Sequence, residues 1–223
     1  MSSYKSSKQM RCELCFELTR NQIYANDYRV FYHCLNCDLI FVPSKYHLNA
    51  AEEKKQYDYH QNSSNDLGYR QFLTGVITPL LDYLKPGMKG LDFGSGPGPT
   101  LHLLLKEAGF ETLLFDPFYA NNSEHLKQQY DFVTCTEVVE HFSTPCLAWQ
   151  QLSRLIRNDG YLAIMTLFHQ GIEHFSNWWY KNDLTHVAFY SARTMEWIAR
   201  QLNLQFIYYD EKRVMIFKKS SVS

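Results

Sequence analysis

The segment Gly90–Thr100 combines an apolar run, glycines at positions 94, 96 and 98, and the start of an amphipathic run. The apolar residues before Gly94 predict a buried strand, and the leucines after Thr100 predict a helix that ends at Gly109. The glycines would let the backbone approach a ligand, and free amide hydrogens at a helix start attract a carboxylate or phosphate. The segment therefore predicts a nucleotide-type binding site.

Two common phosphate-binding patterns do not fit this turn. Its spacing is Gly-x-Gly-x-Gly, whereas the dinucleotide pattern is Gly-x-Gly-x-x-Gly, and the Gly-Lys-Ser/Thr of a P-loop is missing. A nicotinamide oxidoreductase is disfavoured for this reason, although it stays open as an alternative. A second acid, Asp116, closes the apolar run 112–115 at about the distance from which it could reach a ribose.

The glycine turn, together with Asp92 before it and Asp116 after it, resembles the class I S-adenosylmethionine-dependent methyltransferases. The resemblance implies that the turn binds the methionine part of S-adenosylmethionine and that Asp116 holds the ribose hydroxyls. The cofactor contacts predicted in this way are Asp92, Gly94, Ser95, Gly96, Gly98, Asp116, Pro117, Thr136 and Glu137.

The run Glu137-Val-Val-Glu-His141 follows a buried-strand pattern and resembles the ubiquinone-biosynthesis branch of these methyltransferases. Ligands of open α/β sheets lie beyond the carboxyl ends of strands, so Thr136, Glu137 and His141 should border the methyl-transfer site. If the acceptor is a hydroxyl, His186 is the first candidate for a catalytic proton acceptor and His141 the second. The alternative for each histidine is a packing or capping role.

Four of the six cysteines form two pairs, Cys12-x-x-Cys15 and Cys34-x-x-Cys37, separated by a stretch of zinc-ribbon length. Four thiolates suit a closed tetrahedral zinc site, which would be structural because no position is left for water. Disulfides or scattered thiols are the alternative, and neither is favoured in a chain that lacks an apolar signal segment. His33 adjoins Cys34 and is not counted as a ligand.

The predicted organisation has four parts: a flexible terminus (1–11), a zinc ribbon (12–43), a connector or lid (44–68) and a methyltransferase domain (69–219). Binding residues concentrate on loops, so substrate or lid contacts are assigned to Tyr57, His60, Asn62, Tyr69, Trp178, Trp179 and Tyr180. The alternatives are a plain polar linker and an aromatic cluster that only packs. The run from Trp179 to Ser191 resembles a segment of zinc-ribbon-bearing methyltransferases whose substrates are largely unassigned.

The predicted fold class is α/β: a Rossmann-like, mostly parallel sheet with a C-terminal antiparallel hairpin over residues 205–217. The interval between Asp116 and the next strand pattern, 132–136, is too short for a crossover helix plus a further strand. We therefore expect the usual third strand to be shortened or missing, which leaves open what binds the adenine.

The chain has 223 residues, 45% of them hydrophobic, and a formal net charge of −1. This composition allows one substantial core and offers no broad basic surface for nucleic acid. The sequence thus predicts a cytoplasmic methyltransferase with a small-molecule acceptor and no membrane span. The alternatives are an RNA or protein methyltransferase that docks through the ribbon, and a non-catalytic S-adenosylmethionine-binding protein. The acceptor, the atom methylated and the oligomeric state are not determined.

Overall fold

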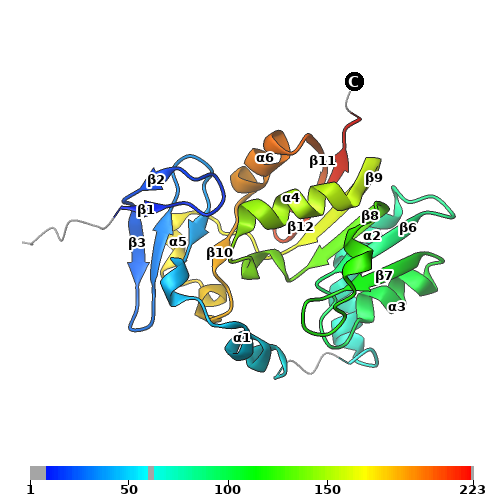
Figure 1. Ribbon diagram of the computed structural model, residues 1–223, viewed down its shortest axis with the longest axis horizontal. Helices are drawn as coiled ribbons and strands as arrows, with labels where there is room; N and C mark the ends of the chain where they lie inside the picture. The colour runs from blue at the N-terminus through cyan, green and yellow to red at the C-terminus, as the bar shows by residue number, and fades with distance from the viewer. Residues whose placement is uncertain (1–8, 60–62, 222–223) are drawn as a thin grey trace, which may run out of the picture.

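The computed structural model describes residues 9–59 and 63–221, so residues 1–8 of the predicted flexible terminus and the predicted lid residues His60 and Asn62 lie outside it. Its largest element is a six-stranded sheet with the order β11-β12-β9-β8-β6-β7 (Figure 1). The strands are β6 (Lys89–Phe93), β7 (Glu111–Phe115), β8 (Tyr130–Thr136), β9 (Ile156–Met165), β11 (Leu204–Tyr209) and β12 (Val214–Lys219).

Strands β6 to β9 are mutually parallel, and β12 is antiparallel to both of its neighbours. The predicted Rossmann-like sheet with a C-terminal antiparallel hairpin is confirmed. The missing third strand is confirmed as well, because β7 is the edge of the sheet. Residues 117–129, all of which the structure describes, form only an isolated bridge between Asp116 and Ala120 and the short 3₁₀ helix η2 (Ser123–Leu126).

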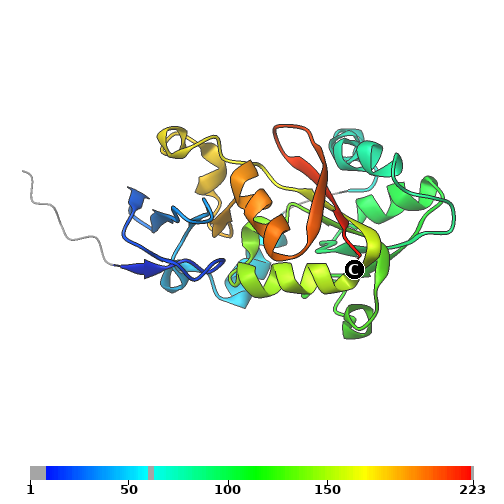
Figure 2. The same cartoon turned by 90° about the horizontal axis from the view of Figure 1, so that it is seen from above.

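Helices cover both faces of the sheet (Figure 2). Alternate residues of a strand point to opposite faces: Phe132 packs with α2 (Leu67–Leu81) and α3 (Thr100–Glu107), whereas Val133 packs with α4 (Pro145–Leu155) and α6 (Ala192–Gln201). β9 and β12 divide their side chains in the same way. This alternation is why the strands are apolar along nearly their whole length.

One local sequence pattern differs from the structure. Asn-Asp-Gly at residues 158–160 is typical of a turn, and it predicts a helix that ends at Arg157 and a strand that begins at Tyr161. Instead α4 ends at Leu155 and β9 begins at Ile156, with Asp159 at a φ of 61° inside the strand. The pairing with β8 shifts register between Tyr130 and Phe132, so these turn-forming residues make an irregularity within a strand rather than its boundary.

The N-terminal part of the chain forms two small sheets. β1 (Met10–Arg11) pairs with β2 (Leu18–Thr19), and β3 (Gln22–Ala25), β4 (Val30–His33) and β5 (Ile40–Phe41) form an antiparallel sheet. The fourth strand of that sheet is β10 (Ala188–Phe189), which comes from the loop after β9 (Figure 1). The predicted ribbon is therefore built partly by the methyltransferase end of the chain.

An aromatic cluster reinforces this junction. Phe31 of β4 packs edge-on against Phe175 of α5 (Ile172–Phe175) and close to Phe189 of β10, and all three are buried. The remaining short elements are η1 (Ser44–Tyr46), α1 (Ala50–Tyr57), η3 (Val139–His141) and η4 (Trp179–Asn182). Within residues 9–59 and 63–221, no helix combines the length and apolarity needed to cross a bilayer.

Candidate functional site

The glycine turn follows β6 at the point where the chain order across the sheet reverses. From β6 the chain goes outward to β7 and then returns to β8 on the other side, and ligands of such sheets bind at this switch point. Gly94 has a φ of 80°, and a Cβ there would meet Val138 Cγ2 at 2.3 Å. Only glycine fits this position, because the backbone passes so close to the segment after β8.

Asp116 holds the turn in place. Its Oδ2 accepts a hydrogen bond from Gly96 N (2.9 Å), and its Oδ1 accepts from Phe118 N (2.8 Å) and Tyr119 N (3.0 Å). A carboxylate can accept about four hydrogen bonds, so one acceptor position is left for a ribose hydroxyl. The predicted ribose ligand is thus also the clamp that joins the two strand ends.

Buried polar groups surround the turn. Ser95 Oγ is buried and has no hydrogen-bond partner among the described residues, so it could bind a polar ligand. Asp92 is only 2% exposed, and its Oδ1 accepts from Thr134 Oγ1 at 3.0 Å. Burial raises the pKa of Asp92 to about 7, with the nearby Asp116 adding to the shift.

Glu137 lies directly after β8 with a φ of 53°, a backbone conformation rarely adopted by residues other than glycine. Burial, and next the neighbouring Glu140, raise its pKa to about 8. Its Oε1 is buried and unpaired within the described part of the chain, whereas Oε2 lies 3.4 Å from Tyr180 Oη. This strained, partly unsatisfied carboxyl at a strand end fits a binding residue.

The structure brings His141 and His186 together, with 4.8 Å between their ring centroids. His186 Nδ1 donates to Tyr180 O (2.8 Å) and His141 Nδ1 donates to Thr185 O (3.1 Å). A carbonyl oxygen only accepts, so each ring has a proton on Nδ1, and the neutral form of either ring presents a lone pair at Nε2. Burial, and next His141, lower the pKa of His186 to about 4, so this ring is neutral at pH 7.

Glu140 is fully buried beside this pair. Its Oε1 accepts a hydrogen bond from Tyr180 Oη, while Oε2 finds no partner in the described ranges. Glu140, His141 and His186 each offer a ligand atom, and these atoms lie within 4.8 Å of one another. Carboxylate and imidazole ligands of this kind could hold a divalent cation.

The predicted lid residues divide into two groups. The first group faces the site. Tyr57 of α1 packs edge-on against His141, with 5.2 Å between the ring centroids. Burial, and next the charges of Asp92 and Glu137, raise the pKa of Tyr69 to about 12. Tyr180 is buried among the site carboxyls. Trp178 instead packs on Phe175 and Phe189, and Trp179 is 67% exposed.

The sulfurs of Cys12, Cys15, Cys34 and Cys37 converge to within 4.8 Å of one another, and no disulfide joins them. The Sγ atoms of Cys12 and Cys37 lie 3.6 Å apart, and those of Cys15 and Cys34 lie 3.4 Å apart. Four sulfurs with these separations suit tetrahedral coordination of one ion. His33 is not one of these candidate ligands, and its Nε2 instead lies 2.8 Å from Asp38 Oδ1.

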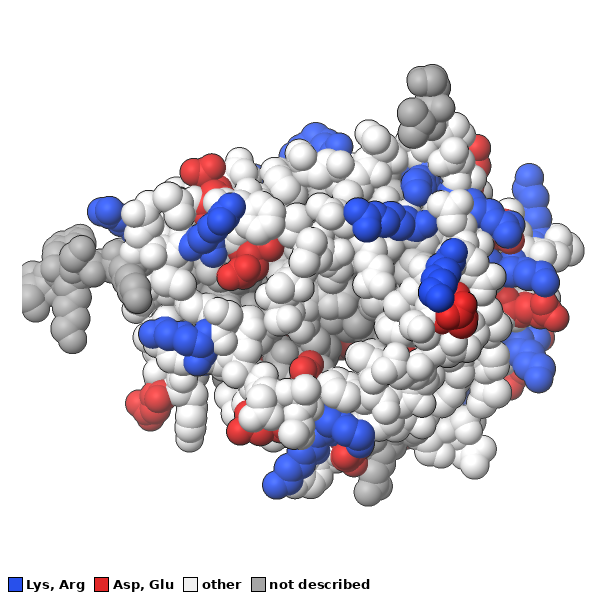
Figure 3. Space-filling model, viewed as in Figure 1, with Lys and Arg blue, Asp and Glu red and all other residues white. Residues whose placement is uncertain are grey.

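The surface is hollowed near the middle of the face shown in Figure 3, above the segment that carries α1. Basic and acidic side chains are interspersed over this face rather than gathered into a basic stripe.

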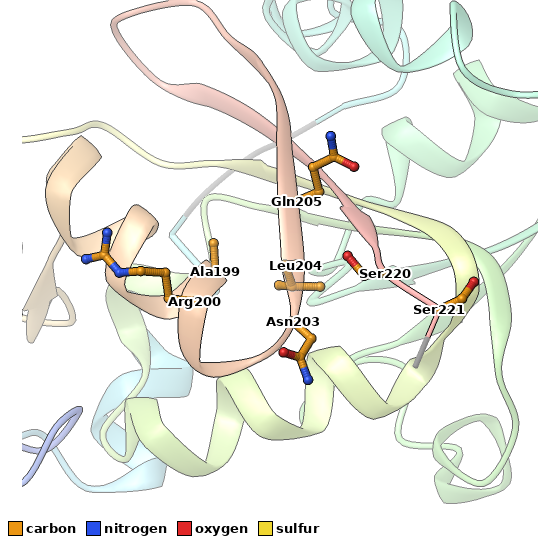
Figure 4. A pocket seen from close by; sticks show the side chains of 7 residues that line it. All are labelled: Ala199, Arg200, Asn203, Leu204, Gln205, Ser220 and Ser221. Atoms are coloured by element: carbon orange, nitrogen blue, oxygen red, sulfur yellow. The ribbon is translucent and has the colours of Figure 1, made fainter. Parts of the chain in front are cut away.

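A separate groove of about 480 Å³ (Figure 4) is lined by Ala199, Arg200, Asn203, Leu204, Gln205, Ser220 and Ser221. It lies at the start of β11, the opposite end of the sheet from the glycine turn, and contains none of the predicted site residues.

Residues 67–209 match the family model of the methyltransferase domain. The chain belongs to this family. It is 29% identical over 94 residues to a ubiquinone biosynthesis O-methyltransferase of Shewanella pealeana, and 32% identical over 97 residues to the protein of the same name in Salmonella paratyphi A. These matches cover 42% and 44% of this chain and only 39% and 40% of the relatives, so the chain spans about two fifths of the curated relatives that it matches.

Solved structures show the same fold at lower identity. A SAM-dependent methyltransferase from Archaeoglobus fulgidus has a TM-score of 0.52 and 18% identity, over 67% of this chain and 94% of that one. Magnesium protoporphyrin IX methyltransferase from Synechocystis PCC 6803, with SAH bound, has a TM-score of 0.50 and 14% identity, over 76% and 94% of the two chains. At these identities the likeness concerns the fold alone.

Two residues of the site were not predicted as members of it. The sequence places Glu140 only within the motif that ends at His141, and it places Arg29 only within a strand pattern before Cys34. A fully buried glutamate is not distinguishable in sequence from an exposed one on a short helix. Arg29 acts across 152–157 residues of sequence, and no local pattern reports such a contact.

The raised pKa of Asp92 leads to a pH-dependent prediction. Between about pH 4 and pH 7 the folded protein binds a proton at Asp92 that the unfolded chain has released, so folding stability contributed by this group is lost as pH rises through that window. The variant Asp92→Asn cannot ionise and escapes this loss. Its melting temperature, relative to that of the wild type, should therefore be higher at pH 8 than at pH 5. A difference that is constant or reversed between the two pH values would show that Asp92 is already ionised at low pH in the folded protein.

Proposed function

We propose that this protein transfers a methyl group from S-adenosylmethionine to a hydroxyl of a small molecule. The observation that carries the proposal is the convergence, at the carboxyl ends of β6, β7 and β8, of the glycine turn, the Asp116 clamp and the paired histidines. Family membership supports the methyl donor, and the matched relatives, which are O-methyltransferases, support an oxygen acceptor. The interspersed charges around the hollow favour a small molecule over RNA.

The cofactor would supply the electrophilic methyl group on its sulfonium. The protein then has to orient the acceptor, exclude water and remove a proton. The amides of residues 94–98 and the unpaired Ser95 Oγ would bind the amino-acid part, and Asp116 would accept one ribose hydroxyl. The carboxyl groups of Asp92 and Glu137 would favour the positive charge of the bound cofactor.

His186 is the proposed proton acceptor, with His141 as the second choice. Its Nε2 lone pair is available because Nδ1 is committed to Tyr180 O. With S-adenosylmethionine bound, His186 Nε2 would take up the proton that the acceptor hydroxyl loses on methylation. A second role has its own support: Glu140, His141 and His186 could hold a divalent cation that would lower the pKa of a bound hydroxyl.

A zinc ion held by the four cysteines is proposed as a structural element. Apolar side chains of the small sheets, such as Phe31 and Ile40, are buried together with Phe175 and Phe189 of the later loop. Metal binding can add folding free energy to so small a segment. The proposed boundaries of this ribbon remain 12–43, with 44–68 as connector and 69–219 as methyltransferase domain.

Cofactor binding can be tested at Gly94. We expect Gly94→Ala to weaken the affinity for S-adenosylmethionine at least about tenfold, because the added Cβ would meet Val138 Cγ2 at 2.3 Å and shift the turn whose amides would bind the ligand. Isothermal titration calorimetry measures this. Gly87→Ala is the matched control, since Gly87 also has a positive φ (88°) but meets nothing within 4 Å. A wild-type protein that binds no S-adenosylmethionine would refute the proposal.

Proton removal can be tested at His186. We expect His186→Gln to lower turnover by about 10²–10⁴-fold while the affinity for S-adenosylmethionine stays unchanged. Transfer of a radiolabelled methyl group to a panel of hydroxylated aromatic rings gives the readout, and His125→Gln, on η2, is the control. Full turnover in His186→Gln would remove this residue from the mechanism. Loss of wild-type turnover in a chelator, restored by Mg²⁺, would instead favour the cation-holding role.

The metal prediction concerns Cys34, which is fully buried. We expect the purified wild type to contain one zinc ion per chain and Cys34→Ala to contain almost none, with a lower melting temperature, because three thiolates cannot close the site. Elemental analysis by mass spectrometry measures the metal. Cys146→Ala, which removes a cysteine outside the cluster, should keep its zinc. Equal zinc in Cys34→Ala and Cys146→Ala would contradict the assignment.

A further inference from the structure

Arg29 directly precedes β4 in the ribbon and is only 2% exposed. Its guanidinium faces the loop that carries His186. Nη1 donates to the carbonyl oxygens of His186 (2.8 Å) and Leu184 (3.2 Å). Nη2 donates to those of Lys181 and Asp183. All four terminal N–H groups are therefore used, and every acceptor is a backbone carbonyl within residues 181–186.

The carbonyls of this loop are divided between two tasks. Those of residues 181, 183, 184 and 186 accept from Arg29, whereas those of Tyr180 and Thr185 accept from the imidazoles of His186 and His141. The same turn of backbone is thus clamped from one side by the ribbon and orients both histidines on the other side. A planar fork of four donors fits this arrangement, and the three donors of a lysine ammonium do not.

Other ribbon contacts fix the same segment. Val42 N, just after β5, donates to Val187 O (2.9 Å), and Val187 N donates to Glu140 O (2.8 Å). The β5–β10 pairing continues directly from there. Val187 therefore connects the backbone of the ribbon to the backbone of Glu140 through two hydrogen bonds.

We propose that Arg29 is a positioning residue, through which the folded ribbon sets the Nδ1–H tautomer and the orientation of His186 and His141. The ribbon then serves as a support for the reaction centre rather than as a docking module for a macromolecule. This inference rests on the proposed function, because it takes the histidine pair to face the reacting group.

Long-range ¹H–¹⁵N correlation spectra of ¹⁵N-histidine-labelled protein at pH 7.5 test the proposal. In the wild type we expect His141 and His186 to give the pattern of the Nδ1–H tautomer. In Arg29→Ala that pattern should be lost for both rings, giving mixed tautomers or broadened signals, and added methylguanidinium should restore it. Arg29→Lys, which keeps the charge, should restore it only partly.

Two controls separate positioning from general damage. His125 is an internal reference, because its Nδ1 also donates to a backbone carbonyl, Leu114 O (2.8 Å), and its signals should not change. Arg11→Ala removes an exposed arginine of β1, directly before the ribbon, and should leave all histidine signals unchanged.

Wild-type signals of His141 and His186 in Arg29→Ala would overturn the proposal. If that variant does not fold, Arg29→Lys decides, since unchanged signals there would overturn it equally. Calorimetry with S-adenosylmethionine on the same samples keeps the two ideas apart. A changed tautomer with no cofactor binding in any sample, wild type included, would refute the proposed function and leave the positioning role of Arg29 standing.

Discussion

The peptide carbonyls of residues 180–187 lie mostly inside the protein, and each buried carbonyl needs a donor. In this segment the donors come from three places: the Arg29 guanidinium, the two imidazoles and the backbone of β5. The His186 imidazole lies within the segment, whereas Arg29, His141 and the residue after β5 are distant in sequence. If Arg29 positions the histidine pair as proposed, the geometry of the pair depends on the ribbon being folded against the methyltransferase sheet.

The cofactor side of the site obeys a related constraint, which is the close approach of two strand ends. Gly94 lies so near Val138 that no side chain fits at position 94. Asp116 accepts three hydrogen bonds from backbone amides. The shape of the turn is thus set before any ligand arrives. Such preorganisation means that little ordering remains to be done on binding.

Charge is distributed unevenly in this small volume. Asp92 and Glu140 are buried and Glu137 is half-buried. Asp92 and Glu137 have raised pKa values, chiefly because burial disfavours their ionised forms. A cationic ligand would reverse that balance by stabilising the carboxylates. The same carboxyls that destabilise the empty fold at neutral pH would then favour a sulfonium or a metal ion, which is a common trade between stability and function.

Local patterns determined the sheet strands, the flanking helices, the paired cysteines and the glycine turn, because periodicity, glycine spacing and Cys-x-x-Cys pairs act over short distances. They also indicated that no third strand fits after Asp116. Only the tertiary structure decided that β10 completes the ribbon sheet, that residues 158–160 lie inside a strand, and that Arg29 clamps the loop before His186. These features depend on which segments, distant in sequence, form hydrogen bonds with each other's backbone in the folded protein. No local stretch of the chain determines those contacts.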